Sequence, residues 1–149
     1  MPLDDDRSAL SKYRLEKAEK NLKAAKLLFE NKLLSESINR SYYCIFHSAR
    51  GLIAYDRFDS KRHSTIIAHF NRNYVKTEKI EKEYSKIISK AFKIRTDSDY
   101  KDFYLVSKEE TKEQLENAEK FFKRIKKYIE EFYINAGNQL EKGSSDQYF

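Results

Sequence analysis

Apolar residues recur at alternating steps of three and four along most of the chain, which is the spacing of one face of an α-helix. The first series predicts a helix over about residues 8–31, whose other face is Lys and Glu. It consists of Leu15, Ala18, Leu22, Ala25 and Phe29. A second series predicts a second helix, for which Ser35 or Ser37 is the expected N-cap. This series consists of Ile38, Tyr42, Ile45, Ala49 and Leu52.

Three further helices are expected after the polar break "DRFDSKRHS". A shorter one carries Ile66, Ile67, Phe70 and Tyr74, and the next, from about Glu78, carries Ile80, Tyr84, Ile87, Ile88 and Ala91. Between residues 95 and 106 the periodicity fails, so "RTDSDYKDFYLV" predicts a loop with aromatic anchors. Ser107 and Glu110 then form a capping box for a last helix that runs to about residue 135. Its apolar face is Leu115, Ala118, Phe122, Ile125, Ile129 and Phe132.

The composition supports an all-α fold. Pro2 is the only proline and there are three glycines, so little interrupts a helix along the 149 residues. Four longer helices and a short one with short connections predict an up-and-down antiparallel helical bundle, in which the first, second and last helices pack side by side. We expect one domain over residues 8–135, a flexible N-terminus over 1–7 and a frayed or disordered tail over 136–149.

Charge and cysteine content restrict the function classes only loosely. The net charge of +6 permits attraction to polyanions, although many charges lie in mixed runs that neutralise one another locally. Cys44 is the only cysteine, which excludes an intrachain disulfide and suggests a buried thiol in a reducing compartment. No apolar run approaches the length of a membrane span, and the acidic start "MPLDDDRS" is unlike a signal peptide, so we expect a cytoplasmic protein without membrane association.

A polar stripe on the second helix is the first candidate site. Residues seven apart lie about 20° short of two full turns, so Arg40 and His47 share a face with Glu36, Tyr43 and Arg50. An Arg/His pair suits metal-free chemistry on RNA phosphodiesters, because imidazole moves protons near neutral pH and guanidinium holds phosphate oxygens. A structural alternative is that Glu36 pairs with Arg40 and His47 packs as a satisfied polar residue.

On a single copy of the helix, Arg40 and His47 are too far apart along the axis to act closely together. A separation of seven residues is about 10.5 Å along the helix axis, so a second copy across a two-fold axis would complete a cleft. Basic residues nearby would guide a polyanion towards it: Arg50, Arg57, Lys61 and Arg62.

Other chemistries have weaker support. His63 and His69 are six apart and face different sides of a helix, so no metal site is expected. Cys44 shows no sign of an activated thiolate, and there is no glycine-rich phosphate loop. No cofactor is expected.

The order of these features resembles the HEPN domain family over about residues 8–133. The resemblance rests on "LEKAEKNLKAAKLLFENKLLSESI", "NRSYYCIFHSARGLIA", "RTDSDY" and "SKEETKEQLENAEKFFKRI". It implies a helical bundle that is commonly a homodimer, often encoded beside a minimal nucleotidyltransferase and in some pairs part of a toxin–antitoxin module.

The resemblance also implies roles for particular residues. HEPN ribonucleases use an R-x4-6-H motif, which Arg40 and His47 fit as R-x6-H, although the motif of the toxins usually lies later in the bundle. In the later arrangement R-x4-Y-H, Arg95 and Tyr100 match the first two positions, and Lys101 replaces the histidine. Lysine binds phosphate, but with a usual pKa of about 10.4 it is a poor general base at neutral pH. Tyr100 would be an AMP acceptor or a site aromatic, like Tyr43.

Three readings follow from the sequence. The leading one is a HEPN-like bundle that dimerises, acts with a nucleotidyltransferase and binds nucleotide or RNA phosphate through the Arg40/His47 stripe and the Arg95/Tyr100 loop. Arg50, Arg95 and Lys101 are its expected phosphate ligands. The first alternative is a metal-independent endoribonuclease that uses the Arg40/His47 pair at a dimer cleft. The second alternative is a purely structural interaction module in which every polar group is paired internally.

Overall fold

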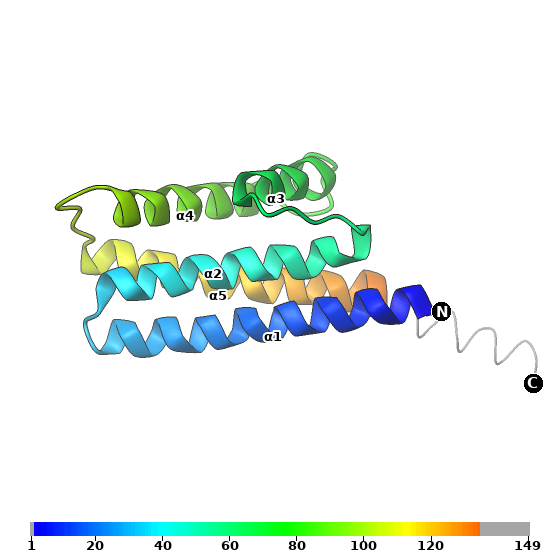
Figure 1. Cartoon of the computed structure of the whole chain (residues 1–149), viewed down its shortest axis with the longest axis horizontal. Helices are drawn as coiled ribbons and strands as arrows, with labels where there is room; N and C mark the ends of the chain where they lie inside the picture. The colour runs from blue at the N-terminus through cyan, green and yellow to red at the C-terminus, as the bar shows by residue number, and fades with distance from the viewer. Residues whose placement is uncertain (1, 135–149) are drawn as a thin grey trace, which may run out of the picture.

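The computed structural model describes residues 2–134, with side chains described from residue 6 onward. All regular structure in this part is helical (Figure 1). The helices are α1 (Pro2–Glu30), α2 (Leu34–Ile53), α3 (His63–Phe70), α4 (Lys82–Tyr100) and α5 (Lys108–Ile129). The all-α bundle of four long helices and a short one is therefore confirmed. The predicted tail, 136–149, lies outside the described residues.

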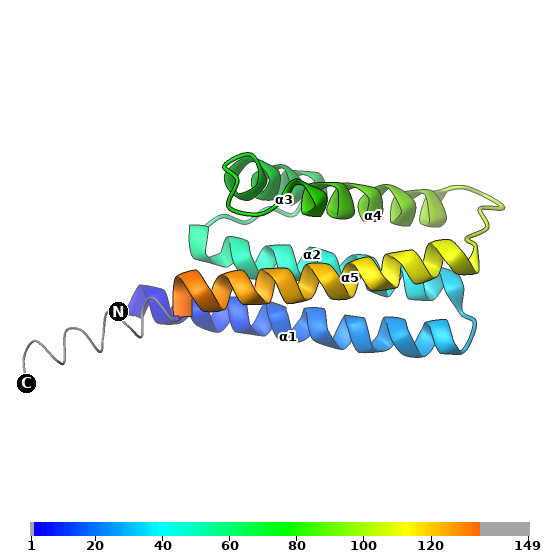
Figure 2. The same cartoon turned by 180° about the vertical axis from the view of Figure 1, so that it is seen from behind.

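Helices α1, α2 and α5 pack side by side, and α3 and α4 cover the other side of α2 (Figures 1 and 2). Each long helix runs antiparallel to its neighbour in the chain: α1 to α2, and α4 to α5. Helix α2 is consequently the centre of the bundle and contacts all four of the others.

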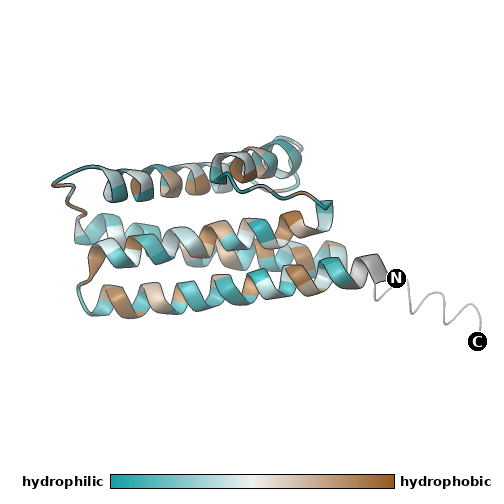
Figure 3. Cartoon of the chain, viewed as in Figure 1, coloured by the Kyte–Doolittle hydropathy of each residue, from teal (hydrophilic) through white to brown (hydrophobic). Residues whose placement is uncertain are grey.

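The core gathers around α2, of whose 20 residues 12 are buried. Apolar residues recur along each helix between hydrophilic ones (Figure 3), and their buried faces form one continuous cluster. Small residues on α2 allow α1 to approach closely, and the Ser37 hydroxyl donates a 2.8 Å hydrogen bond to the Ala25 carbonyl of α1. Cys44 is fully buried, as the sequence predicted.

The first two helices differ from the prediction at their ends. Helix α1 begins at Pro2 rather than at residue 8, and it ends where Lys32 adopts a φ of 62° and the Leu33 N–H bonds the Leu28 carbonyl. Helix α2 then begins at Leu34 with no side-chain cap, so the expected N-cap at Ser35 or Ser37 is wrong.

Helix α4 starts at Lys82, four residues after the predicted start at Glu78. Glu78 has a φ of 63°, which a helix interior cannot accommodate, and the Ile80 N–H bonds the carbonyl of Tyr74. Tyr74 itself lies in a π-helical turn, Asn71–Val75, that extends α3.

The predicted loop over residues 95–106 is wrong in its first half, because α4 continues to Tyr100. Its last turns carry few apolar residues, but ion pairs four residues apart support them, such as Arg95 with Asp99. Of the predicted aromatic anchors in the remaining loop, Phe103 is 100% exposed, whereas Tyr104 is half-buried and its hydroxyl bonds Glu110 of α5.

One of the two hydrogen bonds of the predicted capping box at the start of α5 is confirmed. The Glu110 N–H donates to the Ser107 hydroxyl at 3.0 Å, as in a capping box. The Glu110 carboxylate does not return to Ser107 but accepts a hydrogen bond from the Tyr104 hydroxyl at 3.2 Å. Phe132, which we predicted to be buried, lies beyond the end of α5 in the π-helical turn Glu130–Ile134 and is 58% exposed.

Candidate functional site

An aromatic and histidine cluster lies where α2 meets α3 and α4. We call it the α2 cluster, and it consists of Tyr42, Tyr43, Phe46, His47 and His63. Tyr42 and Tyr43 lie on one turn of α2, Phe46 and His47 lie on the next, and His63 is the first residue of α3. Stacked and edge-to-face contacts join the rings, which favours fixed positions for both imidazoles.

His63 is held between a ring and a hydroxyl. Its imidazole stacks on Phe46 with the centroids 4.0 Å apart, and its Nδ1 lies 2.7 Å from the Tyr42 hydroxyl. Burial raises the pKa of Tyr42, so this hydroxyl keeps its proton. When the hydroxyl donates to Nδ1, the proton of the neutral imidazole is on Nε2. Burial and the positive charges of Arg95 and Arg50 lower the pKa of His63, which favours that neutral form.

His47 is a neutral imidazole with an unused nitrogen. Its ring stacks on Tyr43 with the centroids 5.7 Å apart, and its Nδ1 is buried and bonds no other residue in the part of the chain that the structure describes. Burial, followed by the charges of Lys17, Arg50 and Arg14, lowers the pKa of His47 to about 4. The expectation that His47 packs as a satisfied polar residue is therefore not met.

Arg95 reaches the α2 cluster from α4. Its guanidinium lies 5.6 Å from the ring centroid of Tyr42 and 5.5 Å from that of Tyr43, and it donates a 3.2 Å hydrogen bond to the Tyr43 hydroxyl. Its Nε also lies 2.9 Å from an Asp99 carboxylate oxygen. Because Tyr43 touches both Arg95 and His47, the structure brings together the two segments that the sequence singled out separately.

The remaining predicted residues lie around this cluster. Arg40 is exposed and donates to the Asn21 side chain of α1 at 3.2 Å, rather than pairing with Glu36. No hydrogen bond joins Arg40 to His47 among the described residues. Tyr100 is 77% exposed at the end of α4, and Lys101 follows it with its ammonium 3.5 Å from an Asp97 carboxylate oxygen.

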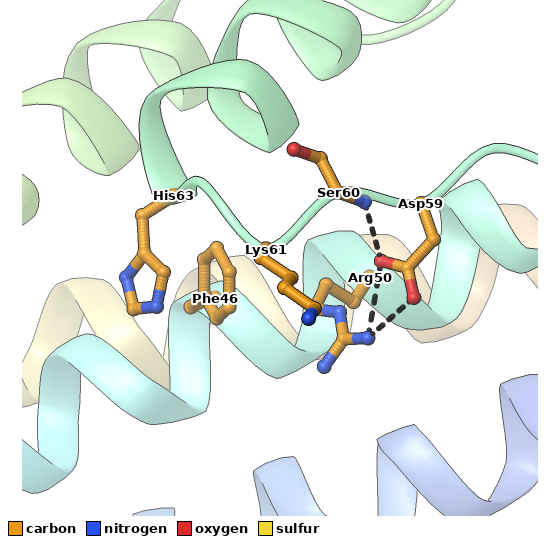
Figure 4. A pocket seen from close by; sticks show the side chains of 6 residues that line it. All are labelled: Phe46, Arg50, Asp59, Ser60, Lys61 and His63. Atoms are coloured by element: carbon orange, nitrogen blue, oxygen red, sulfur yellow. Dashed lines mark hydrogen bonds and ion pairs between the residues drawn. The ribbon is translucent and has the colours of Figure 1, made fainter.

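A pocket of about 500 Å³ opens beside the cluster, between α2 and the segment before α3 (Figure 4). It is lined by Phe46, Arg50, Asp59, Ser60, Lys61 and His63. One guanidinium nitrogen of Arg50 donates to both oxygens of Asp59, at 3.1 and 2.9 Å, and the Ser60 N–H donates to Asp59 at 2.8 Å. Arg50, predicted as a phosphate ligand, is thus already paired with a carboxylate.

A second guanidinium approaches the same carboxylate from α1. Arg14 is buried, donates to Asp59 at 3.2 Å and also donates to the Arg50 carbonyl at 2.9 Å. Burial opposes ionisation of Asp59, but the Ser60 N–H and the two guanidiniums outweigh it and lower the pKa of this carboxyl. Asp59 is therefore an anion held between two arginines.

Sequence reasoning missed Arg14, Phe46 and Asp59, and it considered His63 only as a metal ligand. Phe46 was not in the predicted apolar series of α2, and Asp59 and His63 both lie in the polar break after it. The only signal in the sequence was the run of basic residues in that break. The contacts of His63 with Tyr42 and Phe46 join residues far apart in the chain, which periodicity does not reveal.

Two further observations concern the described residues only. Among them, no three side chains of His, Cys, Asp or Glu lie close enough together to hold a metal ion. None of the helices in residues 2–134 combines the length and apolar character needed to cross a bilayer.

Comparisons with known proteins agree with one another. A family model described as the HEPN domain matches residues 11–128. A protein of Methanocaldococcus jannaschii whose name marks it as a candidate toxin is 40% identical over 117 residues, which are 78% of this chain and 87% of that protein. A UPF0332 protein of Thermotoga maritima is 32% identical over 127 residues, 85% of this chain and 96% of the relative. A second candidate toxin of M. jannaschii is 29% identical over 115 residues, 77% of this chain and 78% of that protein.

Proposed function

The chain belongs to the HEPN domain family, and we propose that it is a toxin-type HEPN protein that binds RNA or nucleotide phosphate at the α2 cluster. It acts in the cytoplasm with a nucleotidyltransferase partner, as one half of a toxin–antitoxin module. One observation carries the binding proposal: the Arg95 guanidinium lies over Tyr43, which stacks on His47. The names of the two candidate toxins support the toxin assignment.

The chemistry of the α2 cluster suits a single-stranded nucleic acid. Guanidinium groups bind phosphate oxygens through two parallel hydrogen bonds, and aromatic rings stack on unpaired bases. Two cations lie close to the aromatic residues: Arg95 lies over Tyr42 and Tyr43, and Arg50 lies 6.0 Å from the Phe46 ring centroid. Arg40 extends the positive charge along α2 towards its N-terminal half.

The exposed end of α4 supports a partner that modifies or contacts it. Tyr100 lies five residues after Arg95, and it is 77% exposed, so its hydroxyl is accessible. A nucleotidyltransferase that transfers AMP needs an accessible hydroxyl acceptor, and Tyr100 satisfies this requirement, with Lys101 next to it as a phosphate ligand. A homodimer would place two copies of the α2 cluster in one cleft.

Binding of a labelled single-stranded RNA, followed by fluorescence anisotropy at fixed salt, tests the proposal. Arg95→Gln and Arg40→Gln should each weaken binding, with Arg95→Gln raising the Kd about tenfold because it removes a positioned guanidinium. Arg72→Gln is the matched control, since it removes the same charge from an exposed position in the turn after α3. Equal affinities for all three variants and the wild type would refute binding at the α2 cluster.

A second candidate function is metal-independent cleavage of RNA. It is favoured by the buried Nδ1 of His47, which has no hydrogen-bond partner within residues 2–134, although a pKa of about 4 makes the neutral ring a weak base at pH 7. In this reaction His47 takes the proton of a ribose 2′-hydroxyl, the 2′-oxygen bonds to phosphorus, and the 5′-oxygen leaves with a proton from water, while Arg40 holds the phosphate.

The cleavage candidate is tested by incubating RNA with the purified protein in EDTA. Cleavage that disappears in a folded His47→Gln protein supports it, and RNA that stays intact with the wild type rejects it. The interpretation as a purely structural module is disfavoured because it requires every buried polar group to be paired, whereas His47 Nδ1 and Ser41 Oγ have no partner among the described residues.

A further inference from the structure

We propose that the pocket between α2 and α3 is a second phosphate site and that Asp59 occupies it in the free protein. The Asp59 carboxylate lies where a phosphate group would lie, bonded to the guanidiniums of Arg50 and Arg14 and to the Ser60 N–H. A nucleotide phosphate enters by displacing this carboxylate from Arg50. This inference rests on the proposed function and adds a second site and an internal competitor to it.

The charges of the pocket leave room for an added anion. Arg14 and Arg50 both pair with Asp59, and Lys61 lines the same pocket; within residues 2–134 no other carboxylate pairs with any of these three cations. Lys61 is exposed, lines the pocket, and makes no ion pair within the described residues. A phosphate monoester carries more negative charge than a carboxylate and has three terminal oxygens, so it can bond Arg50 and Lys61 at the same time.

Asp59 can leave the position without unfolding a helix. Its side chain is 52% exposed, and it belongs to the segment between the turn Ala54–Asp56 and α3, which has no regular secondary structure. Arg14 keeps its hydrogen bond to the Arg50 carbonyl when Asp59 moves, so the buried guanidinium retains a partner.

The opposite wall of the pocket suits the rest of a nucleotide. His63 and Phe46 are stacked there, and Figure 4 shows Phe46 between His63 and the Arg50–Asp59 pair. A phosphate at Arg50 therefore places the attached sugar and base next to a pair of aromatic rings, which is the arrangement that favours base stacking. The ligand class is a nucleoside monophosphate or the end of an RNA strand.

Titration with AMP, followed by calorimetry and by amide NMR spectra, tests the inference. Asp59→Asn keeps the shape of the side chain and removes its charge, so it should tighten AMP binding about tenfold, whereas Lys61→Gln should weaken it several-fold. Asp102→Asn is the matched control, because it removes one negative charge from the exposed loop after α4. In the wild type, AMP should shift the Ser60 amide signal, since this N–H loses its carboxylate acceptor.

An Asp59→Asn protein that folds and binds AMP no more tightly than Asp102→Asn would overturn the inference. If Asp59→Asn does not fold, an unchanged Ser60 signal in the wild type at saturating AMP would overturn it equally. The proposed function has its own readout, because it is tested by the RNA affinity of Arg95→Gln, and Arg95 does not line this pocket. If Arg95→Gln weakens RNA binding but Asp59→Asn does not change AMP binding, this inference alone is rejected. If Asp59→Asn tightens AMP binding but Arg95→Gln leaves RNA binding unchanged, the α2 cluster is rejected as the RNA site.

Discussion

Tyr43 and Arg95 lie on different helices, and the Arg95 guanidinium donates a 3.2 Å hydrogen bond to the Tyr43 hydroxyl. This contact fixes the end of α4 against α2 and keeps a cation over the ring that stacks on His47. It therefore links the stability of the bundle to the geometry of the proposed RNA site.

Replacing Tyr43 by Phe separates these two contributions. The variant keeps the ring and its stacking but removes the acceptor for Arg95, so we expect a loss of about 1 kcal/mol in the free energy of unfolding. RNA binding should weaken less than in Arg95→Gln, because the guanidinium stays near the ring. Urea unfolding and RNA anisotropy measure the two effects. An Arg95→Gln protein that binds RNA better than Tyr43→Phe would contradict this order.

Cys44 should be inert in the folded protein. Burial raises the pKa of its thiol to about 12, the side chain is fully buried, and the S–H donates to the Ala118 carbonyl at 3.7 Å. The thiolate is the reactive form, so we expect labelling by a disulfide reagent at pH 8 to be about a hundredfold slower than in urea. Rapid labelling of the native protein would show that α2 and α5 separate often.

Ser107 should matter for the stability of α5. Ser107→Ala removes the oxygen that accepts the Glu110 N–H, and we expect a loss of about 1 kcal/mol, the usual cost of an N-cap. Ser89→Ala, at an exposed position within α4, is the control and should change stability by a few tenths of a kcal/mol at most. Thermal unfolding compares the two, and equal melting temperatures would argue against the cap.

The sequence predicted the architecture and the polar stripe because both depend on periodicity within one helix. The series on α1, α2 and α5 identified the three helices that pack together. The end of α4 was missed since Arg95 to Tyr100 is held by ion pairs and by contacts with α2 instead of by an apolar stripe.

Contacts between distant segments account for the rest of what the sequence did not reveal. His63 stacks on Phe46 and Asp59 joins Arg14 to Arg50, and each contact depends on where the polar break between α2 and α3 folds back. A short polar segment has no periodicity that would indicate its path. The basic residues of the pocket were therefore visible in the sequence, but their shared carboxylate was not.

Gly51 of α2 packs closely against α1. A Cβ atom at this position would lie 3.2 Å from the Leu15 side chain and 3.4 Å from the Ser11 carbonyl oxygen. In Gly51→Ala, a small shift of Leu15 and a gain of about 1 kcal/mol in helix propensity should nearly cancel. In Gly51→Val a small shift of Leu15 does not make enough room, so overpacking should lower the free energy of unfolding by about 2 kcal/mol. Urea unfolding decides, and a Val variant as stable as the wild type would show that the helices can separate.

The lowered pKa of His47 predicts that acid destabilises the protein before its carboxylates titrate. Burial and nearby cations lower this pKa from 6.5 to about 4, so between these pH values the unfolded chain binds a proton that the folded chain excludes. The stability due to neutral His47 is complete above pH 6.5 and is lost as the pH falls towards 4. His63, whose pKa is also lowered, acts in the same direction.

Urea unfolding at pH 7 and pH 5 measures this effect for the wild type and for His47→Gln. We expect the wild type to lose about 1 to 2 kcal/mol more than the variant over this interval, after allowance for solvent around a partly exposed ring. Glutamine has no proton to gain, so its stability should fall only through His63 and the other groups. Identical losses in the two proteins would mean that folding does not lower the pKa of His47, so that the ring is protonated in the folded state at pH 5.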